Sequence, residues 1–129
     1  MILGIYDESA HFLGNKIEKI KTEDVWVYVI KEKMNPYYVD VLNSKVVKKF
    51  LEFTHEVYKK ELGEEFGRNM PGFFTDEPQF AKLKIPYSLI LPEYFKKVNG
   101  YELTDALLSL FEDTPDAGIH RYNFWKVIS

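Results

Sequence analysis

The sequence predicts an α/β fold, namely a partial (β/α) barrel-like segment with an N-terminal β-hairpin or meander and a helical C-terminal half. The first third of the chain contains short runs of β-branched and aromatic residues, which are typical of strands. A long helical pattern over 44–62 then separates these runs from another apolar run at 70–75, as in a βαβ unit. From Pro92 onward the spacing of apolar residues and the helix start signals indicate helices.

Length and composition favour one folded domain, with 1–37 as its β-rich segment and 38–129 as a βαβ unit plus helices. The chain has 129 residues, of which 46% are hydrophobic, so a disordered protein is excluded. The net charge of −3 comes from interspersed acidic and basic residues, so we expect no nucleic-acid partner. There is no cysteine, no signal-peptide pattern and no apolar run near the roughly 20 residues of a membrane span. We therefore expect a cytoplasmic protein without disulfides or a membrane anchor, and the excess of Lys and Glu over Gln is typical of thermophiles.

The N-terminal strands are predicted from local apolar runs. ILGIY at 2–6 is the first, Gly14-Asn15 is a turn signal, and DVWVYVI at 24–30 is the strongest run. Both faces of this last run are apolar, so it should be covered on both sides. The stretch 31–43 reads as a loop, since Pro36 disfavours helix at the residue before it.

A helix is predicted over 44–62, with Asn43 or Ser44 as its N-cap and Gly63 as its C-terminal stop. Apolar residues recur along it at spacings of four, three and four, which predicts a buried face. The residues on this face are Val46, Phe50, Phe53 and Val57, with Lys and Glu residues opposite.

The run at 70–75 is predicted to be a buried strand of a parallel sheet, reached by a right-handed crossover from the earlier strand. Three helices should follow: one opened by Pro92 and closed by Asn99-Gly100, one around 103–111, and one after Thr114-Pro115. The last pattern is still periodic at 129, so we expect the chain to be a piece of a larger architecture.

Two adjacent carboxylates, Asp76 and Glu77, follow the predicted strand and are the candidate catalytic residues. Strand C-termini of parallel α/β sheets face the ligand, and a partly desolvated Glu there can have a raised pKa and donate a proton. Glycoside hydrolysis needs such an acid and a second carboxylate about 5 to 9.5 Å away. The same two residues could instead cap the turn opened by Pro78, and this alternative stays open.

The loop before the long helix contains the candidate substrate-binding residues Tyr38, Asp40 and Asn43. An aromatic ring with neighbouring carboxylate and amide oxygens suits the faces and hydroxyls of a sugar. Asn43 could equally be only an N-cap, and Tyr38 only a packing residue.

Other candidates have less support in the sequence. His55 lies on the polar face of the predicted helix and reads as a surface histidine. His11 and His120 have no companion at metal-ligand spacing, and no loop of regularly spaced oxygens suggests calcium. No phosphate-binding or triad motif occurs, so no metal or cofactor is expected.

The stretch 38–128 resembles part of the catalytic barrel of large bacterial glycoside hydrolases of the α-L-rhamnosidase type and their uncharacterised relatives. The matching positions are Tyr38, Asp40, Leu42 and Asn43; Phe50, Thr54, His55 and Glu56; Phe66 through Pro78; and Leu91, Pro92, Phe95 and Gly100 through Leu103. The most specific part is the phrase TDEP at 75–78.

This resemblance implies a (β/α)₈ setting with Glu77 as catalytic carboxylate or sugar ligand, Asp76 beside it, and Asp40 and Asn43 on a substrate-facing loop. A full barrel needs about 250 residues, and the strands that should supply the partner carboxylate are not in this sequence. We therefore expect a carbohydrate-related protein or fragment that binds an oligosaccharide or glycoside but is inactive in isolation.

Two alternatives remain from the sequence. One is a noncatalytic α/β module from a truncated reading frame that self-associates into a homo-oligomer through exposed apolar faces. The other is a small complete enzyme that combines Asp76 and Glu77 with a carboxylate from a second subunit.

Overall fold

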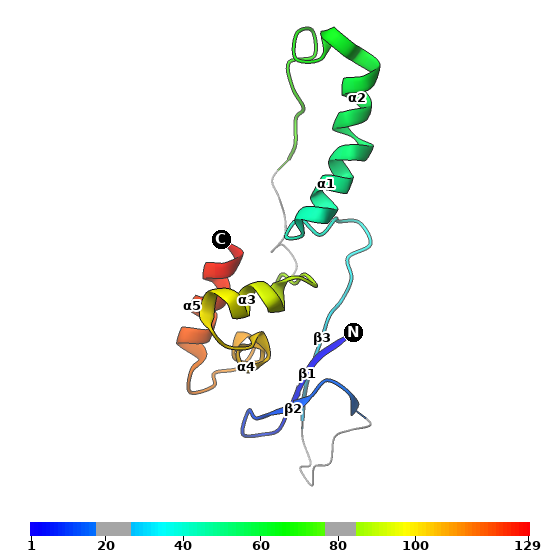
Figure 1. The fold of residues 1–129 in the computed structure, drawn as a ribbon. Coiled ribbons are helices and arrows are strands. Elements are labelled where there is room, and N and C mark those ends of the chain that lie inside the picture. Colours follow the sequence, from blue (N-terminus) through cyan, green and yellow to red (C-terminus); the bar gives the residue numbers. More distant parts are fainter. Residues whose placement is uncertain (18–26, 77–84) are drawn as a thin grey trace. The chain divides into compact units, whose positions relative to one another are not determined.

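The computed structural model describes residues 1–17, 27–76 and 85–129 of the chain (Figure 1). The chain divides into two compact units. Unit 1 comprises Met1–Pro36 and Leu89–Ser129, and unit 2 comprises Tyr37–Ser88. Unit 1 is therefore built from both ends of the sequence, with unit 2 between them along the chain.

The sheet of unit 1 is antiparallel, and its described strands are β1 (Ile2–Tyr6), β2 (Phe12–Gly14) and β3 (Tyr28–Lys31) in the order β2-β1-β3. The central strand β1 pairs Ile5 with Gly14 of β2 on one side and with Val29 of β3 on the other. The predicted strand at 2–6 and the second half of the predicted strand at 24–30 are confirmed. Residues 24–26 lie outside the described part.

The turn between β1 and β2 is formed by Asp7 through His11. One carboxylate oxygen of Asp7 accepts hydrogen bonds from the backbone N–H groups of Ser9, at 2.9 Å, and His11, at 2.8 Å. The bond from the His11 backbone is the main reason that the pKa of Asp7 is lowered. The Gly14-Asn15 signal lies after this turn, so the connection between β1 and β2 was not predicted.

Four helical segments follow in unit 1: α3 (Leu91–Asn99), α4 (Leu103–Leu107), the 3₁₀ helix η3 (Leu108–Leu110) and α5 (Ala117–Ile128). Pro92 lies in the first turn of α3, and Gly100 ends the helix with a φ of 81°, a left-handed conformation that glycine adopts without strain. The three predicted C-terminal helices are therefore confirmed.

The core of unit 1 lies where these helices meet β1. Phe95 and Phe124 are 0% exposed, and burying each ring stabilises the unit by about 1.5–3 kcal/mol. Tyr6 is also fully buried, and its hydroxyl donates a hydrogen bond to the Thr104 backbone oxygen at 2.6 Å. Burial, and to a smaller degree the charge of Asp105, raises the pKa of Tyr6. The other buried apolar residues are Ile5, Leu91, Leu103, Ala106, Leu107, Leu108 and Ala117.

Unit 2 contains α1 (Ser44–Phe53), α2 (His55–Leu62) and the short 3₁₀ helix η2 (Gly63–Glu65). The predicted helix over 44–62 is confirmed except at Thr54, where φ is −116° and ψ is −83° and the helix is interrupted. The Thr54 hydroxyl donates to the Phe50 backbone oxygen at 2.7 Å, a local bond that competes with regular helix geometry.

The predicted buried face of this helix is wrong. None of the residues of α1 and α2, all of which the structure describes, is buried, and Phe53 is 70% exposed. The spacing of apolar residues correctly indicated one side of a helix. It could not show whether another element covers that side.

The predicted strand at 70–75 is also wrong, and with it the parallel βαβ crossover. Residues 71–76 have no regular secondary structure, and only an isolated bridge joins Phe66 to Met70. Phe73 instead packs on α2, with ring centroids 4.0 Å from His55 and 5.5 Å from Tyr58. Helices and a sheet thus occur together as predicted, but the described strands are antiparallel and form no barrel.

Candidate functional site

The N-terminus of α1 brings together two predicted substrate-binding residues, Asp40 and Asn43. The Asn43 side-chain oxygen accepts from the backbone N–H of Lys45 at 3.1 Å, so the predicted N-cap is confirmed. The Asn43 backbone N–H in turn donates to the backbone oxygen of Asp40 at 3.1 Å. These two bonds fix the loop against the first turn of the helix.

Asp40 has a further partner far along the chain. The hydroxyl of Ser88, a buried residue, donates to a carboxylate oxygen of Asp40 at 2.7 Å. This bond holds a half-buried carboxylate at the end of the loop. Sequence reasoning had no signal for it, because 48 residues separate the two partners.

Tyr38 lies in the same loop and is 42% exposed, so part of its ring faces solvent. Its exposed ring, the Asp40 carboxylate and the Asn43 amide are the types of group that contact sugars. Tyr38, Asp40 and Asn43 thus share one loop, in which Asp40 bonds to Ser88 and Asn43 caps α1. Their substrate-binding role stays a prediction.

Asp76 lies in the irregular segment after Phe74, and both side chains are exposed, Phe74 to 95%. Glu77, the other candidate catalytic carboxylate, lies outside the described residues, and so does Pro78. The apolar strand that was expected to present these carboxylates is absent from 70–75. Their predicted catalytic role stays a prediction.

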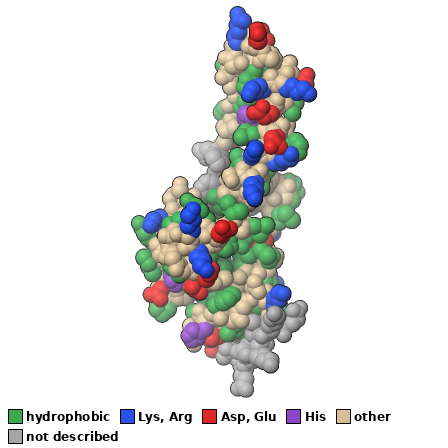
Figure 2. All heavy atoms as spheres, viewed as in Figure 1, with side chains coloured by type: hydrophobic (Ala, Val, Ile, Leu, Met, Phe, Trp, Pro, Cys, Tyr) green, Lys and Arg blue, Asp and Glu red, His purple; other side chains and the backbone are tan. Residues whose placement is uncertain are grey.

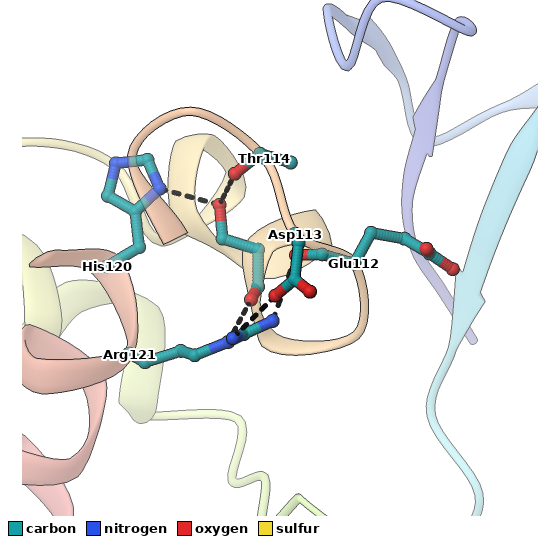
Figure 3. Close-up of polar contacts among 6 residues, drawn as sticks. Glu112, Asp113, Thr114, His120 and Arg121 are labelled. Carbon is teal, nitrogen blue, oxygen red and sulfur yellow. Dashed lines mark hydrogen bonds and ion pairs between the residues drawn. The ribbon is translucent and has the colours of Figure 1, made fainter. Parts of the chain in front are cut away.

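A second polar cluster, which was not predicted from the sequence, lies between η3 and α5 in unit 1. Ser109 is 2% exposed, and its hydroxyl lies 2.6 Å from Thr114 Oγ1 and 2.7 Å from His120 Nδ1. Figure 3 shows His120 and Arg121 reaching from α5 toward the loop that contains Thr114.

Arg121 ties the same loop to α5. Its Nε donates to the Ser109 backbone oxygen at 2.7 Å and its Nη2 to the Glu112 backbone oxygen at 3.0 Å (Figure 3). Its Nη1 forms an ion pair with Asp113 at 2.8 Å (Figure 3). One side chain thus satisfies backbone oxygens at the end of η3, which would otherwise need other donors.

A serine hydrogen-bonded to a histidine is the arrangement of an activated nucleophile, but this one is buried. The Ser109 oxygen is enclosed and shared between Thr114 and His120, so a substrate has no access to it. The His120 ring also packs on Tyr101, with centroids 5.7 Å apart. We assign the cluster a structural role, which is to fix the start of α5 on η3.

The described residues contain no group of three His, Asp or Glu side chains that could hold a metal ion. An open hollow of unit 1 is lined by Met1, Ile2, Asn15, Lys16 and Ile17, and none of these side chains is a carboxylate. Within the described ranges, no helix has the length and apolarity to cross a membrane.

Comparison of the chain with protein-family profiles, with curated proteins and with solved structures gave no match.

Proposed function

We propose that this chain is a glycoside-hydrolase-like segment that contributes carbohydrate-contacting side chains but does not hydrolyse glycosides by itself. The observation that supports it best is the loop before α1, where the Ser88 hydroxyl holds the half-buried carboxylate of Asp40 at 2.7 Å. Asn43 and the partly exposed Tyr38 belong to the same loop. A carboxylate can accept sugar hydroxyls, and an exposed tyrosine ring of the same loop can pack on the apolar face of a sugar.

The exposure of the segment before Glu77 supports the proposal that the chain does not hydrolyse glycosides by itself. A glycosidase acid is desolvated in a pocket and faces a second carboxylate across the scissile bond. Phe74 is 95% exposed and Asp76 is exposed, so the described end of this segment is not in such a pocket. A barrel around these residues would need strands from additional polypeptide.

Catalysis is tested with aryl glycosides, among them p-nitrophenyl α-L-rhamnoside. Wild type and Glu77→Gln should release nitrophenol at the same rate as buffer. Turnover by the wild type that vanishes in Glu77→Gln would overturn the proposed inactivity, and it would leave the carbohydrate assignment standing.

Binding is tested separately by NMR titration of the labelled chain with L-rhamnose and with a panel of oligosaccharides. Chemical-shift changes should concentrate at residues 38–43. The affinity for the sugar should fall at least fivefold in Asp40→Asn or Tyr38→Ala. Tyr94→Ala is the matched control, because Tyr94 is a 52% exposed tyrosine in unit 1. If no sugar of the panel shifts 38–43, or if the control loses binding equally, the carbohydrate assignment is wrong.

A further inference from the structure

The segment 71–76 is attached to the helices of unit 2 through one side chain. It has no regular secondary structure, and Phe73 is the one residue of the segment that is not exposed. Residues 71–75 form no backbone hydrogen bond with the part of the chain that the structure describes. A segment with so few buried contacts can open locally without unfolding the rest of its unit. We call the segment 71–76 the strap.

Phe73 attaches the strap to an aromatic group formed by α2 and by the residue that follows η2. The centroid of its ring lies 4.0 Å from that of His55, 5.5 Å from that of Tyr58 and 6.1 Å from that of Phe66. The tilted and edge-on geometries are those that aromatic rings prefer. His55 makes the closest of these three contacts, and it is half-buried, whereas the sequence indicated a surface histidine.

Thr54, the residue at which the helix is interrupted, holds the ring of His55. The Thr54 hydroxyl has one proton, which it donates to the Phe50 backbone oxygen at 2.7 Å. Toward His55 Nδ1, at 2.8 Å, the same hydroxyl is therefore an acceptor, so Nδ1 carries a proton. In the neutral ring Nε2 is then the unprotonated nitrogen. The interruption of the helix is thereby linked, through one ring, to the contact that attaches the strap.

We propose that the strap is a conformational switch with a closed and an open form, and that Thr54 holds it closed through His55. The structure shows the closed form. Opening withdraws Phe73 from α2, and it changes the position of Asp76, which lies at the end of the strap. The inference is independent of the sugar-binding role proposed above, because it uses none of the residues of the loop 38–43.

The closed form should outweigh the open one on the order of tenfold, because Phe73 is half-buried and gains only part of the stabilisation of a fully buried ring. α1 and α2 already expose hydrophobic side chains among charged ones (Figure 2), and Phe53 is 70% exposed, so opening does not change the character of this surface. One neutral hydrogen bond, such as that between Thr54 and His55, changes an equilibrium by about two- to tenfold. The balance between the two forms should therefore respond to this single bond.

The first experiment measures whether the strap is closed, by ¹⁵N relaxation of the labelled full chain at about pH 8, where histidine is mostly neutral. Phe73→Ala provides the open reference, in which the amides of 72–76 should become mobile. Phe74→Ala is the matched control, because Phe74 is 95% exposed and its loss should leave the strap closed. If the amides of 72–76 are as mobile in the wild type as in Phe73→Ala, the strap is not closed and the proposal is wrong.

The second experiment removes the Thr54 hydroxyl with little change in side-chain shape. In Thr54→Val the amide signals of 72–76 should move along the line from wild type toward Phe73→Ala, as a two- to tenfold lower ratio of closed to open form requires. Thr54→Ser retains the hydroxyl and should keep the wild-type signals. Thr75→Val is the control, since Thr75 is an exposed threonine of the strap itself. Unchanged signals in Thr54→Val would contradict the proposed role of Thr54.

A double-mutant cycle tests whether Thr54 acts through His55. His55→Phe keeps an aromatic ring beside Phe73 but removes the nitrogen that bonds the hydroxyl. In this background Thr54→Val should no longer shift the strap signals, because the bond is already absent. An equal effect of Thr54→Val in both backgrounds would show that Thr54 acts by another route, and it would overturn the proposal.

The protonated nitrogen of His55 separates this linkage from a general effect on the helix. Long-range ¹H–¹⁵N correlation spectra identify which ring nitrogen carries the proton. The wild type should carry it on Nδ1, and Thr54→Val should lose that preference while circular dichroism shows the same helix content. A wild-type ring protonated on Nε2 would exclude the bond from which the switch is inferred. Loss of helix in Thr54→Val with an unchanged ring would assign Thr54 a structural role only, and the proposal would fail.

Discussion

Replacing Tyr6 with phenylalanine tests how the sheet of unit 1 is joined to its helices. The ring of Tyr6 is 1% exposed and packs at 5.5 Å from the ring of Phe12, and both features survive the substitution. What is lost is the 2.6 Å hydrogen bond from the hydroxyl to the Thr104 backbone oxygen. A buried acceptor that loses its donor costs about 1–3 kcal/mol, and we expect about 1.5 kcal/mol for this part-buried bond.

The same substitution should remove a dependence of stability on alkaline pH. The pKa of Tyr6 is raised in the folded state, so its contribution to stability is complete below the unfolded value of about 10. Above pH 10 the unfolded tyrosine loses its proton while the folded one keeps it, and stability falls. At pH 11 this loss is about 1.4 kcal/mol, close to the hydrogen-bond contribution, so wild type and Tyr6→Phe should then be about equally stable.

The assay is urea unfolding, followed by circular dichroism at pH 7 and pH 11. With a slope of about 1.5 kcal/mol/M, the midpoint of Tyr6→Phe should lie about 1 M below wild type at pH 7. Tyr28→Phe is the control, because Tyr28 is 40% exposed in β3 and its change should stay within about 0.5 kcal/mol. An unchanged midpoint at pH 7, or the same difference at both pH values, would refute this reasoning.

Three further substitutions test other parts of the structure. Gly4→Ala should destabilise unit 1 by about 1–3 kcal/mol in urea unfolding, because its Cβ would stand 2.6 Å from the Tyr6 hydroxyl; a neutral effect would show that the Tyr6 ring can move. Asn43→Ala should cost α1 about 1 kcal/mol by removing the N-cap, seen as faster hydrogen exchange in the first turn, whereas Asn43→Asp should retain protection. Ser109→Ala should cost about 1–3 kcal/mol, since it removes a buried hydroxyl that bonds His120; unchanged thermal unfolding would contradict the structural role of that cluster.

The helices were predictable because their signals are local. Pro92 and Gly100 mark the two ends of α3 through their own backbone preferences, and Asn43 caps α1 through a residue two positions away. The interruption at Thr54 was not predicted, because threonine occurs in many continuous helices and its bond to Phe50 is only one of its options.

Side-chain burial and strand pairing depend on residues that are distant in sequence. The predicted buried face of the 44–62 helix and the predicted strand at 70–75 were wrong for this reason. The run at 70–75 has the composition of a strand, yet Phe73 packs on His55 and no strand of the described residues pairs with the run. The same limit applies to the candidate site. The loop with Asp40 was found from its residue types, but its bond to Ser88 and the buried Ser109 cluster required the three-dimensional structure.

The discontinuity of unit 1 has a consequence for how this protein folds as it is made. Tyr6 and its partner Thr104 are 98 residues apart, so at 5–20 residues per second the ribosome needs on the order of 5–20 s to deliver the second after the first. During most of that interval the nascent N-terminal strands lack the unit 1 helices against which they pack, and unit 2 is synthesised within the same interval. We expect the first strands to be the most chaperone-dependent part of the chain and the last to acquire protection during synthesis.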